Sequence, residues 1–200
     1  MFREIVIPNN NEEEFIEVAS RLGIRKLIFL YDPEEFDGKL QDKTTKLNGS
    51  KGLKIESGFM MAQKNARHAK KGLMAAKSSE KDRVFIEKYD VNLMFGLEEA
   101  ARKDYLHQRA SGLNQIMCEL LRKKNIAVGF SYSSLFDPQS YTIIGRMMQN
   151  IRLCQKYKVK TVIGSFASDP YLLRQPHDII SLFSMLGMDS KRTRESWQNL

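Results

Sequence analysis

Residues 113–130, LNQIMCELLRKKNIAVGF, decide the fold class because they contain one complete step from a helix to a strand. Apolar residues recur at helical spacing from Leu113 to Leu121, and the basic residues 122–124 suit the carboxyl end of a helix. Residues 126–130 then form an apolar strand. The stretch therefore predicts an amphipathic helix that leads into the next strand of an alternating α/β chain.

The same alternation extends in both directions. Strands are expected at 4–7, 25–31, 53–62, 73–76, 91–95, 126–130 and 161–166, and helices at about 12–22, 65–72, 79–89, 113–124, 140–157 and 176–186. Strands that alternate with helices imply a parallel sheet with right-handed crossovers. For 200 residues this favours a distorted (β/α) TIM-like barrel, a single α/β domain over residues 1–200, rather than an open doubly wound sheet.

Three segments carry more specific expectations. A polar insertion at about 32–52 should hold one short helix at 33–36 and be the most mobile part of the chain. The polar tail from about 189 should add a helical turn or two that docks through Trp197. The long helix 140–157 is predicted to turn a set of apolar residues inward (Ile144, Met147, Met148, Ile151 and Cys154) and a set of cations outward (Arg146, Arg152 and Lys156).

Charge is distributed unevenly along the chain. Residues 1–100 hold 17 basic and 17 acidic residues, whereas residues 101–200 hold 15 basic and 7 acidic ones, so the second half carries the whole net charge of +8. A basic half suggests a surface for an acidic partner, most commonly nucleic acid. No Lys-rich amphipathic helix with a bulky apolar face supports membrane binding, and no transmembrane run occurs.

The two cysteines, Cys118 and Cys154, fall on apolar helix positions without a CxxC motif, which indicates reduced, buried thiols and a cytoplasmic protein. The first residues, MFREIVIPNN, hold too short an apolar stretch for a signal peptide.

Residues 102–114, RKDYLHQRASGLN, are the strongest functional motif. Ser111 is expected to cap the following helix, and a phosphate between the cations and the helix amino terminus would relieve their repulsion. The alternative is a solvated basic loop before an ordinary helix. In a barrel, loops that follow strands share one face, so Lys103, His107, Arg109 and Arg174 are expected on one rim.

The residues expected to contact a nucleic acid are all basic. They are Arg102, Lys103, His107, Arg109, Arg174, Lys64, Arg67, Lys123, Lys158 and Lys160. For the lysines the competing interpretation is a solvated surface charge. For His107 a binding role is favoured over general-base catalysis, because only Asp104 is near enough in sequence to orient it.

Catalytic chemistry on this chain is not predicted. No GxGxxG motif or P-loop occurs, the first strand ends in Pro8-Asn9 without a His-x-His motif, and the three histidines are isolated. The acidic residues of the basic half are few and dispersed, which disfavours a two-metal nuclease site. No catalytic residue and no bound metal is therefore expected.

The motif 102–114 with the following IAVGFSYSSL, and the segment RMMQNIRLCQKYKVKTVIGSFASDPYLLRQPHDIISLFSMLGM, resemble the ribonuclease P protein component 3 family of archaea and eukaryotes over roughly residues 91–188. The family has Asn where this chain has Ala110, and the insertion 32–52 has no match.

The resemblance implies a distorted α/β barrel and a subunit of the endoribonuclease, a hydrolase, that removes the 5′ leader of precursor tRNA. It implies that the RNA subunit carries the chemistry and its Mg²⁺, and that this chain contacts ribonuclease P RNA, other small ribonuclease P proteins and, indirectly, precursor tRNA. The helix 140–157, with its methionine pair, is one candidate for the protein contact. The alternatives are a free-standing metal-dependent phosphoesterase on a related barrel and a small-molecule phosphate-binding barrel.

Overall fold

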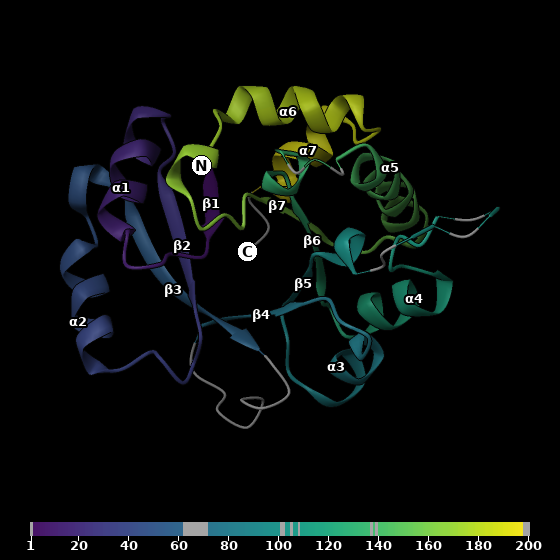
Figure 1. Ribbon diagram of the computed structural model, residues 1–200, viewed down its shortest axis with the longest axis horizontal. Coiled ribbons are helices and arrows are strands. Elements are labelled where there is room, and N and C mark those ends of the chain that lie inside the picture. Colours follow the sequence, from purple (N-terminus) through teal and green to yellow (C-terminus); the bar gives the residue numbers. More distant parts are fainter. Residues whose placement is uncertain are drawn as a thin grey trace.

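The computed structural model describes residues 2–61, 72–100, 103–104, 106–107, 109–136, 138 and 140–197. Within them, seven parallel strands form one sheet in sequence order, which curls into a nearly closed barrel (Figure 1). The strands are β1 (Arg3–Val6), β2 (Lys26–Tyr31), β3 (Lys54–Met61), β4 (Leu73–Lys77), β5 (Leu93–Phe95), β6 (Ala127–Ser131) and β7 (Thr161–Gly164). The predicted TIM-like α/β fold is confirmed.

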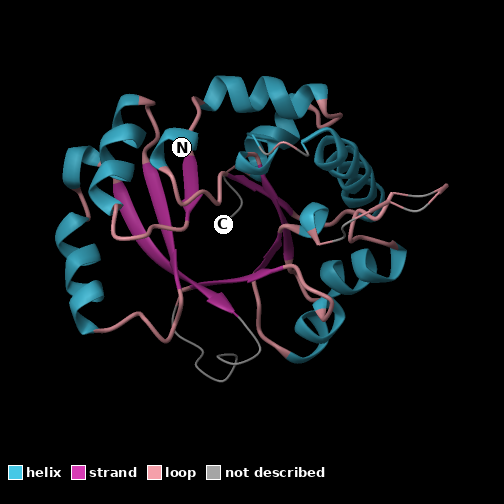
Figure 2. Cartoon of the chain, viewed as in Figure 1, coloured by secondary structure: helices cyan, strands magenta, loops and turns pink. Residues whose placement is uncertain are grey.

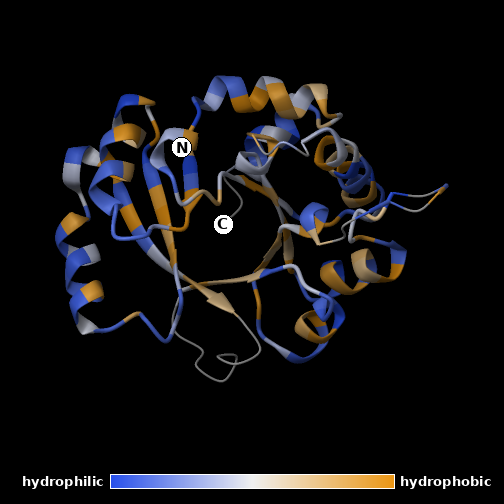
Figure 3. Ribbon diagram, in the orientation of Figure 1, coloured by the Kyte–Doolittle hydropathy of each residue, from blue (hydrophilic) through white to orange (hydrophobic). Residues whose placement is uncertain are grey.

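The helices lie on the outside of this barrel (Figure 2). They are α1 (Glu12–Arg21), α2 (Gly38–Leu47), α3 (Asp82–Lys88), α4 (Gln115–Lys123), α5 (Ser140–Tyr157), α6 (Pro176–Met185) and α7 (Ser190–Ser196). Short 3₁₀ turns include η2 (Leu97–Glu99), η3 (Ser133–Phe136) and η4 (Pro170–Leu172), which follow β5, β6 and β7. Hydropathy alternates around each helix, with hydrophilic residues prominent on the outside (Figure 3).

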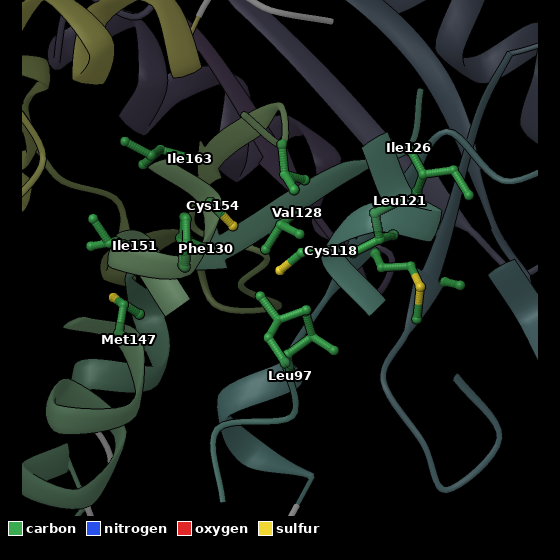
Figure 4. Close-up of a cluster of buried hydrophobic side chains, with 14 of the residues drawn as sticks. Leu97, Cys118, Leu121, Ile126, Val128, Phe130, Met147, Ile151, Cys154 and Ile163 are labelled. Atoms are coloured by element: carbon green, nitrogen blue, oxygen red, sulfur yellow. The ribbon is translucent and has the colours of Figure 1, made fainter. Parts of the chain in front are cut away.

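The largest part of the core lies between the second half of the sheet and its helices. Figure 4 shows Leu97, Cys118, Phe130, Met147 and Cys154 converging there from four elements, η2, α4, β6 and α5. Both cysteines are buried and free, as predicted. On α5 the buried positions of Met147, Ile151 and Cys154 are confirmed, whereas Ile144 and Met148 are only half-buried.

The expectation that Arg146 lies on the outer face of α5 is wrong. Its side chain is buried, and so is that of Asn150 four residues later. Both lie on the face that also presents Met147 and Ile151 to the core, where they meet polar partners from the loop after β5.

The insertion at 32–52 also differs from expectation. Residues 33–36 form a turn, and the helix of this segment is α2, ten residues long. The Asp37 side chain caps α2 by accepting from Leu40 N at 2.8 Å, and Lys43 pairs with the buried Glu12 of α1 at 2.7 Å. The polar composition concealed this helix because α2 buries only Thr44. The basic helix expected at 65–72 falls almost wholly outside the described residues.

The predicted docking of the tail is confirmed. Helix α7 ends at Trp197, whose ring is buried and meets Phe2 edge-on at 5.4 Å between centroids. The Trp197 Nε1–H group donates to the carbonyl of Arg3. The end of the described chain is thereby fixed to the first strand. None of the described helices combines the length and the apolar character that crossing a bilayer would require.

The seam between β1 and β7 is closed by few backbone contacts. A single bridge joins Val6 to Ala167, and Phe166 N donates to Ile5 O at 2.8 Å. The Glu4 carboxyl group lies fully buried beside this seam, where it accepts from Tyr132 OH at 2.9 Å and from Ser165 N. Burial raises the pKa of Glu4 to about 7.

The raised pKa of Glu4 makes the stability of the barrel depend on pH. A buried acid with a raised pKa stabilises the folded state while it is protonated, and this contribution is lost as pH rises from the unfolded value of 4.5 through about 7. The unfolding free energy of the wild type should therefore fall between pH 5 and pH 8. We expect a smaller fall for Glu4→Gln, because glutamine resembles the protonated acid and does not ionise. The two falls in unfolding free energy should differ by at most about 3 kcal/mol. Urea unfolding at both pH values measures this difference.

Glu98, whose pKa burial also raises to about 7, remains in that variant and keeps some pH dependence. An unfolding free energy of Glu4→Gln that falls between the two pH values as steeply as that of the wild type would contradict the assignment.

Candidate nucleic-acid interface

The carboxyl ends of the strands surround a polar cavity of about 570 Å³. The loops after β5, β6 and β7 all reach this end of the barrel, which is where barrel enzymes carry their sites. Lys77 and Glu99 pair there at 3.4 Å, and the hydroxyls of Ser131 and Ser133 donate to the carbonyl of Ser165. Within the described part of the chain, no three His, Cys, Asp or Glu residues gather as a metal site.

The basic loop after β5 is anchored to α5 by Asp104. Its carboxylate accepts from Ala110 N at 2.9 Å and from Arg146 Nε at 2.7 Å. The Arg146 side chain is only 3% exposed, and its Nη1 also donates to the carbonyl of Glu98 at 2.9 Å. The hydrogen bond from Ala110 and the charge of Arg146 hold the pKa of Asp104 below its usual value.

A second anchor lies one turn farther along α5. Asn150 Nδ2 donates to Glu98 Oε1 at 2.8 Å and to the carbonyl of Ser111 at 2.7 Å, and all three residues are buried. Gln149 Nε2 donates to Ser111 Oγ at 3.0 Å. Together with Asp104, these contacts fix both ends of the segment 104–111 to one helix.

The predicted capping role of Ser111 is wrong. Helix α4 begins at Gln115, and Asn114 caps it by accepting from Met117 N at 2.9 Å. Ser111 is buried because its carbonyl and hydroxyl groups bind α5. The first turn of α4 is therefore capped from within the chain, and the cations of the loop do not face an uncapped helix terminus.

Three of the predicted contact residues lie in this loop. Lys103, His107 and Arg109 are exposed. The Arg109 guanidinium lies against Gly145 of α5, so closely that a Cβ atom added at Gly145 would stand 1.4 Å from Nη1. Arg109 therefore lies against the outer side of α5, in the loop that also carries the exposed Lys103 and His107.

Arg174 lies at the same end of the barrel, after β7. Its guanidinium stacks on the Phe136 ring at 4.4 Å, and its Nη1 donates to the carbonyls of Tyr171 and Leu173 at 2.8 Å. Lys103, His107 and Arg109 follow β5 and Arg174 follows β7, so all four lie in loops that leave the carboxyl ends of the strands.

The other predicted contacts lie elsewhere. Lys123, Lys158 and Lys160 are exposed but precede β6 and β7, so they lie at the opposite end of the barrel. Arg102, Lys64 and Arg67 lie outside the described residues. The methionine pair does not form an exposed contact surface, because Met147 is buried and Met148 half-buried.

Sequence reasoning missed Glu98, Gly145, Arg146 and Asn150. A usable signal existed for two of them, because Arg146 and Asn150 fall at helical spacing among Ile143, Met147 and Ile151 and so share the buried face. No comparable signal marks Glu98, whose partners Arg146 and Asn150 lie 48 and 52 residues away on α5.

A solved structure has a similar fold, and curated proteins have similar sequences. An archaeal chain from the "cryo-EM structure of archaeal Ribonuclease P with mature tRNA" superposes with a TM-score of 0.79, at 18% identity over 98% of this chain and 88% of that chain. Ribonuclease P protein component 3 of Thermococcus kodakarensis is 25% identical over 198 residues, which cover 92% of this chain and 86% of the relative. The Methanococcus vannielii protein of the same name is 22% identical over 183 residues, 88% of this chain and 79% of that protein.

The profile of the family described as RNase P subunit p30 matches residues 1–200, the whole length of the sequence. The structural likeness concerns the fold, and the profile match concerns the sequence itself. The chain therefore belongs to the ribonuclease P subunit p30 family.

Proposed function

We propose that this chain is a protein subunit of ribonuclease P that binds the catalytic RNA through the carboxyl-terminal end of its barrel. Its family membership and its curated relatives, which are named ribonuclease P components, support this function. The observation that carries the proposal is the basic loop, which places Lys103, His107 and Arg109 in solvent while Asp104 and Ser111 fix it to α5. Phosphate contacts of this kind supply much of the affinity of proteins for nucleic acids.

In this proposal the endonucleolytic chemistry and its Mg²⁺ belong to the RNA subunit. Of the described acidic residues between β5 and α4, Asp104 binds Arg146 and the backbone, Glu98 is buried and Glu99 pairs with Lys77. The contribution of this chain is to bind and orient the RNA, so that precursor tRNA is contacted indirectly. A partner among the small ribonuclease P proteins completes the assembly, and the free buried thiols suit a cytoplasmic location.

The loop cations give the first test of this proposal. We expect Lys103→Ala with Arg109→Ala to lower precursor-tRNA cleavage by a ribonuclease P reconstituted from its cognate RNA and proteins, most strongly at limiting Mg²⁺. The reason is that two phosphate contacts are lost while the fold is kept. The matched control is Lys39→Ala with Lys46→Ala on the exposed face of α2, which removes the same charge on the other side of the barrel.

Omission of the chain must lower cleavage as well. If omission leaves cleavage unchanged, the proposal is wrong, and phosphoesterase activity with a panel of divalent metals becomes the next measurement. If omission lowers cleavage but the loop variant behaves like the α2 control, the chain is a subunit whose RNA contact lies elsewhere.

The anchor of the loop gives a second prediction. Asp104→Asn removes the carboxylate that accepts from Nε of the buried Arg146 side chain at 2.7 Å. Breaking a fully buried pair costs about 3–5 kcal/mol and an exposed pair contributes about 0–1 kcal/mol, so for the exposed Asp104 we expect a loss of about 1–2 kcal/mol. Because the pKa of Asp104 is lowered in the folded protein, this contribution is present at neutral pH and is lost as pH falls below about 4.

Urea unfolding at pH 7 measures this loss, with the exposed Glu80→Gln as a control that should change stability by less than about 0.5 kcal/mol. An Asp104→Asn variant as stable as this control would show that the pair does not hold the loop.

A further inference from the structure

Helix α5 carries a second cationic feature beyond the loop after β5. A groove of about 360 Å³ runs along its outer face, lined by Arg109 from the loop and by Gly145, Arg152 and Lys156 from the helix, with Met148 and Leu153 beside them. None of the residues that line it is acidic. The 18 residues of α5 themselves include no Asp or Glu.

The cations of this groove follow one stripe of the helix. Gly145, Gln149, Arg152 and Lys156 stand at positions i, i+4, i+7 and i+11, which share one face at 3.6 residues per turn. Arg152 and Lys156 are like charges four residues apart, an arrangement that weakens a helix unless an anion lies between them. Across the described residues, no carboxylate lies within ion-pair distance of Arg109, Arg152 or Lys156.

Gly145 determines how the loop joins this stripe. It is the only glycine of α5, and a Cβ atom there would stand 1.4 Å from Arg109 Nη1, 2.4 Å from Cζ and 3.1 Å from Nη2. The guanidinium therefore lies on the helix backbone in space that any other residue would fill. Asp104, which also attracts Arg109 electrostatically, is itself bound to Arg146 and to Ala110 N.

We propose that Gly145 is a seat for Arg109, and that Arg109, Arg152 and Lys156 form a track along α5 that binds the sugar–phosphate backbone of RNA. The track spans roughly 16 Å from Gly145 to Lys156 at 1.5 Å per residue. Charges spread along a line suit an extended polyanion, whereas a small phosphate ligand needs them to converge on one point. Lys158 and Lys160 follow α5 and extend the track toward the other end of the barrel.

This inference rests on the proposed function and adds to it a defined RNA path with a positioning residue. A flat guanidinium held on a helix presents its edge to phosphate oxygens, which suits bidentate contacts. The half-buried Met148 and Leu153 give the groove an apolar wall that an RNA sugar can contact.

The experiment measures binding of the full chain to its cognate ribonuclease P RNA over a range of salt concentrations. Each phosphate contact contributes about 0.7–0.9 to the slope of log affinity against log salt. Arg152→Ala with Lys156→Ala should therefore lower the slope by about 1.5, whereas Lys39→Ala with Lys46→Ala on α2 should leave it unchanged.

Gly145→Ala tests the seat. Alanine favours a helix interior over glycine, so the melting temperature should not fall, while displacement of Arg109 should lower the slope by just under 1. Adding Arg109→Ala to Gly145→Ala should then change the affinity no further. A slope equal to that of the wild type, or a full additional loss on adding Arg109→Ala, overturns the role of Gly145 as the seat.

The outcomes separate this inference from the proposed function. If the wild-type chain does not bind the RNA, the proposed function fails. If the wild type binds and the Arg152/Lys156 double variant keeps the wild-type slope, the track is overturned while the proposed function stands. If that variant keeps its RNA affinity but loses a protein subunit of the enzyme, the groove binds an acidic protein segment and the track is likewise overturned. Because Arg152 and Lys156 are exposed, their variant remains informative even if Gly145→Ala unfolds.

Discussion

The pairing of Asp104 with the buried Arg146 is the interaction on which the rest of the candidate interface depends. Asp104 belongs to a loop of exposed cations, and Arg146 belongs to the core-facing side of α5. Their contact at 2.7 Å, together with the contacts of Asn150 to Glu98 and Ser111, converts a basic loop into a fixed part of the barrel surface. If RNA binds here as proposed, the residues that are already held against α5 lose less conformational entropy on binding.

The barrel supplies the stable core, and the loop supplies exposed basic residues. Seven parallel strands and their helices supply the core, and the buried acids Glu4 and Glu98 lie where distant segments meet: β1 with the end of β7, and η2 with α5. The cations that can reach a polyanion stand on the outer side of this frame. A metal hydrolase on a similar barrel would instead gather its ligands around the cavity at the strand ends, where this chain presents hydroxyl groups and the Lys77–Glu99 pair.

The alternation of strands and helices could be predicted from the sequence because the repeat of buried apolar positions is local. Helix α5 was predicted for that reason, and the docking of Trp197 was predicted from its large ring in an otherwise polar tail. Helix α2 was missed because it buries only Thr44. The basic loop was visible as a motif, but its attachment was not. Ser111 was predicted to cap a helix. Its hydroxyl group instead binds Gln149, 38 residues away, and its carbonyl binds Asn150, 39 residues away. Arg146 was predicted to be exposed because it is charged, although its helical spacing places it on the buried face of α5. Long-range polar pairs of this kind leave no local periodicity to detect.

The most direct test of the account is to map where RNA lies relative to the barrel. Native Cys118 and Cys154 are buried, so a hydroxyl-radical-generating iron chelate can be attached selectively at Leu106→Cys, at the exposed loop, or at Lys39→Cys on α2. In the assembled enzyme, the account predicts discrete cuts in ribonuclease P RNA from position 106 and none above background from position 39. Cuts from position 39 alone, or equal cutting from both, would contradict the placement of the RNA beside α5.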